Sequence, residues 1–118
     1  MLRNLHQTLS IKGVSGQTYT LHQFSFDDFD DLKGTLPSFG GLYVFTRAVP
    51  GQNQDPVYCG QTDDFSTRFN NHHAESCIRR NNANRISIMR VDNSSNRDAI
   101  EIDILEAYNF TCNTQHNC

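Results

Sequence analysis

A chain of 118 residues has room for one hydrophobic core, which excludes a multidomain assembly. Apolar residues make up 36%, and no run of them approaches the roughly 20 residues of a membrane span. The net charge of −3 argues against nucleic-acid binding only if the charge is spread evenly along the chain.

The N-terminal residues carry no apolar stretch of the kind that directs secretion. We therefore expect a cytoplasmic protein that has no membrane segment. Because cysteines stay reduced in that compartment, all four should be free thiols: Cys59, Cys77, Cys112 and Cys118. They form no Cys-x-x-Cys pair, which gives a structural zinc site little support.

Residues 1–39 are expected to form an N-terminal extension that packs on the same domain as residues 40–118. Within this extension, residues 9–24 predict a β-hairpin, because two glycines mark a turn between segments where apolar and polar residues alternate. Residues 26–32 place three apolar side chains at helical spacing among four aspartates. That spacing favours one turn of helix.

The rest of the chain predicts the element order β-β-α-β-α. The expected elements are strands at residues 42–46 and 56–60, a helix from Asp63 to about Glu75, a strand at 85–91, and a helix from Ser94 or Ser95 to about Asn109. The loop between the first two strands is typical of an antiparallel hairpin. The fold class is therefore mixed α/β (α+β), with a small antiparallel three-stranded sheet flanked by helices and an N-terminal β-hairpin.

Basic residues are concentrated in the second half of the chain. Residues 65–97 contain six arginines and only two acidic residues, so this segment has a net charge of +4. Every base in it is arginine, which suits two-pronged contact with phosphate better than lysine does. We expect nucleic-acid binding by four of them: Arg68, Arg79, Arg80 and Arg85. The alternative is that these charges merely solvate a surface.

The last predicted helix carries a carboxylate on its apolar side. At about 100° per residue, Glu101 shares a face with Ile100 and Ile104. A carboxylate that points inward is costly unless it is paired or bound to metal. Two interpretations stay open at this point. Glu101 forms an ion pair with Arg97 or Arg68, or it has a metal-binding or catalytic role.

Other candidate residues occur in the central segment. Arg68 and His72 are four residues apart, so they should lie on one face of the predicted helix. Tyr43 and Tyr58 each lie on a predicted strand close to glycine. Taken separately, such residues are more often exposed polar side chains or ordinary strand partners than site residues.

Together these positions resemble the GIY-YIG nuclease superfamily. Gly41-Leu42-Tyr43 and Tyr58-Cys59-Gly60 look like its two half-motifs, and residues 60–65 look like the stretch that follows the second. Four further positions match in order and spacing: Arg68, His72, Glu101 and Asn113. The resemblance covers about residues 40–113. Leu42 and Cys59 replace the usual isoleucines of the half-motifs.

This resemblance implies a metal-dependent endonuclease that hydrolyses phosphodiester bonds in DNA. Glu101 would bind one divalent cation, Mg²⁺ or Mn²⁺, and Arg68 would contact the scissile phosphate. Tyr43 or Tyr58 would orient or deprotonate the attacking water, and the family favours Tyr43. His72 would relay the proton, and Asn113 would brace the site.

Two alternatives belong to other classes. A non-catalytic nucleic-acid-binding module of the same fold would keep the arginines without cutting DNA. A purely structural interaction domain would show neither metal dependence nor affinity for DNA. The sequence leaves open the preferred DNA structure, the oligomeric state and whether a partner protein supplies targeting.

Overall fold

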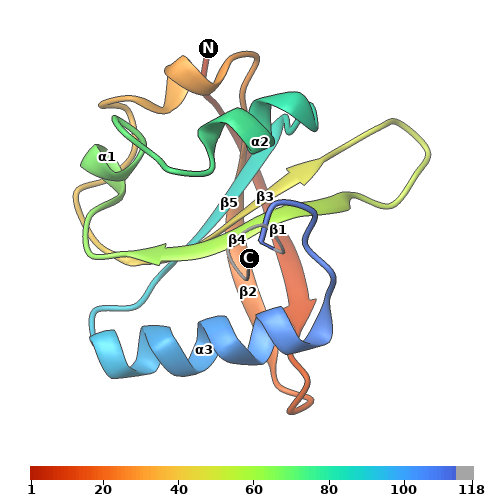
Figure 1. Cartoon of the computed structure of the whole chain (residues 1–118), viewed down its shortest axis with the longest axis vertical. Coiled ribbons are helices and arrows are strands. Elements are labelled where there is room, and N and C mark those ends of the chain that lie inside the picture. The colour runs from red at the N-terminus through yellow and green to blue at the C-terminus, as the bar shows by residue number, and fades with distance from the viewer. Residues whose placement is uncertain (114–118) are drawn as a thin grey trace.

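The centre of the molecule is an antiparallel sheet of five strands. The computed structural model of the chain describes residues 1–113 and orders the strands β1-β2-β5-β3-β4 (Figure 1). The strands are β1 (Arg3–Lys12), β2 (Thr18–Ser25), β3 (Gly41–Arg47), β4 (Asp55–Thr62) and β5 (Arg85–Arg90). Every neighbouring pair is antiparallel.

The prediction of a three-stranded sheet is wrong, because the N-terminal hairpin joins the same sheet. Strand β2 pairs with β5, placing His22 opposite Ile88 and Phe24 opposite Ile86. Without this pairing, β5 would be an edge strand with a row of unsatisfied backbone groups. The hairpin covers that edge, so β5, paired with β2 on one side and β3 on the other, is an interior strand.

The predicted helix from residue 63 to 75 is also wrong, because it divides into two short helices. These are α1 (Phe65–Arg68) and α2 (Glu75–Arg80), and residues 69–74 between them are not helical. Asn70 and Asn71 follow the first helix, and asparagine side chains compete for the backbone hydrogen bonds that a helix needs. Arg68 and His72 therefore do not share a helix face.

The remaining helices start at capping side chains. The turn predicted at residues 26–32 is a 3₁₀ helix, η1 (Phe29–Leu32), and Asp28 caps it. The last helix is α3 (Ser94–Ala107), and it is capped by Asn93, whose side chain accepts from the backbone N–H of Asn96. No helix within residues 1–113 is long and apolar enough to cross a membrane.

The two faces of the sheet carry separate cores. Helices η1, α1 and α2 pack on one face, which we call the tyrosine face because it holds Tyr43 and Tyr58. Helix α3 packs on the opposite face, the α3 face, against a smaller cluster that includes Val44 and Cys59. Figure 1 shows α3 on one side of the sheet and the short helices on the other. Side chains alternate along β3 and β4, so neighbouring residues belong to different cores.

Candidate active site

Two tyrosines stack on the tyrosine face because of the register between β3 and β4. Tyr43 lies opposite Gly60, and Phe45 lies opposite Tyr58. The rings of Tyr43 and Tyr58 are 6.0 Å apart and inclined by 26°. A Cβ atom at Gly60 would lie 2.6 Å from the Tyr43 hydroxyl and 2.8 Å from the Tyr58 ring. Glycine at position 60 is therefore what allows the tyrosines to approach each other.

His72 is buried and contacts the Tyr43 hydroxyl. The distance from the Tyr43 Oη to the His72 Nε2 is 2.6 Å, and the Ala74 backbone N–H donates to His72 Nδ1 at 3.0 Å. Because Nδ1 accepts, the hydrogen of the neutral imidazole is assigned to Nε2. His72 thus donates to Tyr43, an arrangement that favours a donor role over the proton relay expected from the sequence.

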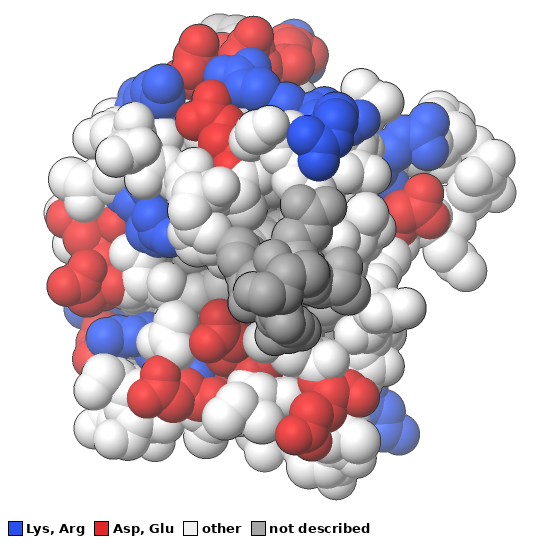
Figure 2. Space-filling model, viewed as in Figure 1, with Lys and Arg blue, Asp and Glu red and all other residues white. Residues whose placement is uncertain are grey.

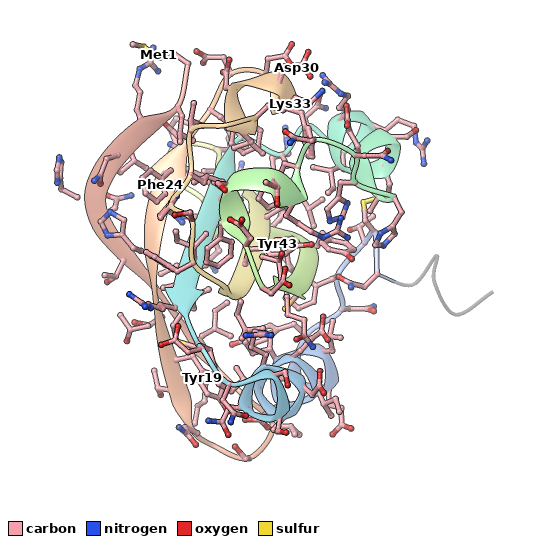
Figure 3. The ribbon with its side chains drawn as sticks, turned by 90° about the vertical axis from the view of Figure 1, so that its left-hand side faces the viewer. Met1, Tyr19, Phe24, Asp30, Lys33 and Tyr43 are labelled. Atoms are coloured by element: carbon pink, nitrogen blue, oxygen red, sulfur yellow. A yellow bond between two sulfur atoms is a disulfide. The ribbon has the colours of Figure 1, made fainter. Side chains whose placement is uncertain are left out.

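The Tyr43 ring is enclosed by aromatic side chains of the α1 region. Its centroid lies 5.0 Å from that of Phe69 and 6.4 Å from that of Phe65, both at steep angles. In Figure 3, Tyr43 lies behind the short helix α1, in agreement with these contacts. Asp64 caps the start of helix α1, and its side chain accepts from the Ser66 backbone N–H. The helix and the loop after it therefore fix the tyrosine from one side.

Tyr58, His73 and Arg68 form a second group beside the first. The Tyr58 hydroxyl is 3.2 Å from His73 Nε2, and an Arg68 Nη2 lies 3.3 Å from His73 Nδ1. Arg68 ends α1, and His73 belongs to the loop before α2. The break between the two helices thus places both residues close to Tyr58. Sequence reasoning missed His73, and its only signal was its position next to His72.

Burial and charge set the acidity of both phenols. Burial raises the pKa of Tyr43 well above its usual value; Tyr58 adds to this rise, and the positive charge of Arg68 opposes it. Burial also raises the pKa of Tyr58, to about 12, again opposed by Arg68, while the negative charge of Glu101 adds to the rise. Arg68 is thus the cation that acts on both tyrosines.

Glu101 reaches the site from the α3 face. Its half-buried carboxylate accepts from Gln61 Nε2 at 3.1 Å, and the same amide donates to Asp98 at 2.5 Å. Burial raises the pKa of Glu101; the Gln61 hydrogen bond opposes this rise, and the charge of Asp98 adds to it. Gln61 lies on β4, the edge strand of the sheet, one residue beyond Gly60. Glu101 therefore lies at the β4 edge, near enough for its charge to act on the pKa of Tyr58.

The ion-pair interpretation of Glu101 is not what residues 1–113 show. Arg97 is buried, but it donates to the backbone carbonyls of Val91 and Asp92 and to Gln61. Arg68 and Glu101 form no salt bridge with each other within the described part of the chain. Gln61, which sequence reasoning did not single out, joins Arg97 to Glu101 instead.

Asn113 braces the outer edge of β4. Its side-chain oxygen accepts from the Cys59 backbone N–H at 2.7 Å, and its amide donates to the Cys59 carbonyl at 2.9 Å. Both backbone groups of Cys59 at the sheet edge are thereby satisfied. The residue on either side of Cys59 is part of the site, so this contact fixes the strand that carries Tyr58 and Gly60.

A disulfide joins Cys77 on α2 to Cys112, next to Asn113. The prediction of free thiols at these two positions is therefore wrong. Sequence spacing gave no sign of the bridge because the fold brings together residues that are 35 positions apart. Cys59 is a free, buried thiol whose pKa is raised by burial. Cys118 lies outside the described residues.

The four arginines proposed to bind nucleic acid have different surroundings. Arg79 contacts three carboxylates, those of Glu75, Asp28 and Asp30, and its guanidinium lies over the Phe29 ring. Arg80 is exposed, whereas Arg85 is half-buried on β5. Figure 2 shows basic side chains over the α2 region and acidic ones along much of α3. Arg68 is the member of this set that lies beside the two tyrosines, where it contacts His73.

Comparison with known proteins gave no match. No protein-family model, no curated protein and no solved structure matches this chain. Membership of the GIY-YIG superfamily therefore stays a prediction that rests on the motifs and on the arrangement of their residues.

Proposed function

We propose that this protein is a metal-dependent endonuclease that hydrolyses phosphodiester bonds in DNA. The observation that carries the proposal is the convergence of two tyrosines, His72 and Arg68 on one face of β3 and β4, with Glu101 at the adjacent edge. These residues come from four separate segments of the chain. A structural role alone does not require an arginine and two phenols to meet at one place.

Glu101 fits the role of ligand to a hard divalent cation. Its carboxylate is partly removed from water, which raises its pKa, and within residues 1–113 no arginine or lysine neutralises it. Mg²⁺ often uses one or two carboxylates together with water and substrate phosphate, so a single Glu is sufficient. When bound, the cation would stabilise negative charge on the phosphate and the leaving oxygen.

Each residue of the proposed site would have a separate role in the reaction. Arg68, a fixed cation with a fork of donors, would bind the scissile phosphate. One tyrosine, as phenolate, would take a proton from water while the water oxygen forms a bond to phosphorus. The bond from phosphorus to the leaving oxygen breaks, and that oxygen takes up a proton from solvent water. His72 donates to the phenol oxygen of Tyr43, which favours the phenolate against the effect of burial.

A panel of DNA substrates tests the proposal. Plasmid, branched and single-stranded DNA would be incubated with Mg²⁺, with Mn²⁺ or with EDTA. We expect cleavage with either metal and none with EDTA. Cutting that continues unchanged in EDTA with metal-free protein would reject the mechanism. Binding without cutting would instead favour the non-catalytic module.

Substitution of the tyrosines identifies the base. Tyr43→Phe and Tyr58→Phe remove the two phenols separately, and Tyr108→Phe, at an exposed position after α3, is the matched control. The variant with the larger loss of single-turnover rate would carry the base. If all three variants cut at the wild-type rate, neither phenol takes part in the chemistry.

The cytoplasmic location stays a prediction, and the Cys77–Cys112 disulfide counts against it. Disulfides persist mainly in oxidising compartments. Trapping of thiols in intact cells distinguishes the cytoplasm from an oxidising compartment. Free Cys77 and Cys112 would indicate the cytoplasm, and a disulfide between them would indicate the oxidising compartment. DNA as substrate and a separate targeting protein likewise stay proposals, which the substrate panel and a pull-down with purified protein would address.

A further inference from the structure

We infer that His73 is a positioning residue of the site, which links Arg68 to Tyr58 and holds the Tyr58 phenol as a hydrogen-bond acceptor. This inference rests on the proposed function. It adds to the site a residue that matches no part of the motif. His73 lies in the loop before α2, and its ring is within hydrogen-bond distance of both partners.

The contact with Arg68 indicates which nitrogen of His73 carries the hydrogen. A guanidinium can only donate, so the Nδ1 atom that faces Arg68 must hold a lone pair. In the neutral ring the hydrogen is then on Nε2, which faces the Tyr58 hydroxyl at 3.2 Å. His73 therefore donates to Tyr58. A donor at the phenol oxygen favours the phenolate, which opposes the rise in pKa that burial causes.

The two histidines give the two tyrosines equivalent surroundings. The Ala74 N–H orients His72 toward Tyr43, and Arg68 orients His73 toward Tyr58. The imidazole rings are 4.8 Å apart and nearly parallel, at 17°. The pairs differ in the group that orients the histidine: a backbone amide donates to His72, whereas the donor to His73 is Arg68, the residue proposed to bind phosphate. Arg68 therefore connects the position of the phosphate to the orientation of the Tyr58 phenol.

The exposure of His73 makes it possible to distinguish a positioning role of this residue from a structural one. His73 is exposed, whereas His72 is buried. Removal of an exposed imidazole should leave the melting temperature nearly unchanged. A loss of activity in such a variant would thus report on the site and not on folding.

Two substitutions separate the two contacts of His73. His73→Gln can place an amide donor near the former Nε2, toward Tyr58, and His73→Asn can place an amide oxygen near the former Nδ1, toward Arg68. We expect His73→Ala to lower the single-turnover cleavage rate by about tenfold to a hundredfold, the range seen when orienting groups are removed. His73→Gln should recover most of this loss, and His73→Asn should recover little. DNA affinity should stay close to wild type because Arg68 remains.

The controls use other residues of this chain. His22→Ala removes a histidine on β2 whose ring forms a hydrogen bond with Asn4. This variant should cut DNA at the wild-type rate. In the background of Tyr58→Phe, His73→Ala should cause a much smaller loss than in the wild type, because the phenol that accepts from Nε2 is absent. Nitrogen-15 NMR of the histidine rings should place the hydrogen of His73 on Nε2, independently of any cleavage assay.

Each outcome decides a separate point. A wild-type protein that cuts no DNA would reject the proposed function, and with it any role for His73 in that reaction. If the wild type cuts and His73→Ala cuts equally fast, the proposed function stands and the inference on His73 is overturned. A spectrum with the hydrogen on Nδ1 would overturn the inference whatever the rates are.

Discussion

The tyrosine face and the α3 face of the sheet differ in how they hold site residues. On the tyrosine face, short helices and a loop surround the two phenols with aromatic rings and histidines. On the α3 face, one 14-residue helix supplies Glu101, and Gln61 is the amide that contacts it. The first arrangement depends on many close contacts, whereas the second depends on one helix. Because the two faces also have separate hydrophobic cores, changes confined to one face should leave the geometry of the other intact.

The largest expected effect is on the α3 face. Glu101→Gln keeps the shape of the side chain and removes the charge that would hold a cation. Single-turnover cleavage should fall by orders of magnitude, because a metal ion stabilises several kcal/mol of developing charge. DNA affinity should persist, because the tyrosine face is unchanged. Glu106→Gln, at an exposed position of the same helix, is the matched control and should cut normally.

The same variant has an expected effect on stability, with a defined pH dependence. Burial raises the pKa of Glu101 in the folded state, so its contribution to stability is present at acidic pH and is lost as pH rises through that pKa. Above that range the wild type carries a penalty that Glu101→Gln lacks. Thermal melts should therefore show the variant holding or gaining stability relative to wild type as pH rises. A variant that melts early at neutral pH yet cuts at the parent rate would end the metal-site proposal.

On the tyrosine face, Gly60→Ala tests the close contact between the phenols. The new Cβ would lie 2.6 Å from the Tyr43 hydroxyl, so the rings must move apart. A displacement of about 1 Å can cost about a hundredfold in rate, and overpacking costs roughly 1–3 kcal/mol of stability. Cleavage rates and denaturant unfolding would measure the two effects. Normal cleavage in a folded Gly60→Ala variant would show that the approach of the rings is not required.

The disulfide should stabilise the tyrosine face without contact to the phenols. It closes a loop of about 35 residues, so reduction should lower the free energy of unfolding by roughly 3–4 kcal/mol. Urea unfolding with and without reductant measures this. Cys59→Ala should keep the dependence on reductant, because Cys59 is a free thiol, and Cys77→Ala with Cys112→Ala should abolish it. Equal stability of oxidised and reduced wild type would contradict this expectation.

The smallest effects are expected at Arg79 and Arg80, two exposed side chains at the end of α2. Arg80→Ala should weaken DNA binding to a similar extent for all sequences and reduce its salt dependence by about one phosphate contact. Arg79→Ala should change binding less, because three carboxylates already engage its guanidinium. Binding titrations at several salt concentrations compare the two variants. A greater loss of affinity in Arg79→Ala would reverse this assignment.

Local patterns in the sequence predicted the parts of the fold that depend on neighbouring residues. The hairpin of β3 and β4, strand β5 and helix α3 occur at the expected places, because alternation and helical spacing are local signals. Pairing of β2 with β5 and the disulfide join distant segments, and no local pattern specifies such partners. For the same reason the five-stranded sheet was missed.

The site residues divide in the same way, into those that local sequence patterns identify and those that depend on contacts between distant segments. Tyr43, His72 and Asn113 were singled out from their order and spacing, and the fold places each in contact with another part of the site region. His73 and Gln61 act through contacts made by loop geometry and by the sheet edge, which the sequence does not display. The helix break after Arg68 brings His73 into place, and a regular 3.6-residue period hides such a break.

The segment that ends in Asn113 has a consequence for self-association. Strand β4 is an outer edge of the sheet, and unpaired edges invite strands of other molecules. The backbone N–H of Cys112 donates to Val57, and the Asn113 side chain occupies both backbone groups of Cys59. The segment thus occupies the hydrogen-bonding groups in the middle of β4 that a sixth strand would otherwise use. The segment that braces the proposed site should therefore also limit aggregation, and its loss should expose the β4 edge to pairing with strands of other copies of this chain.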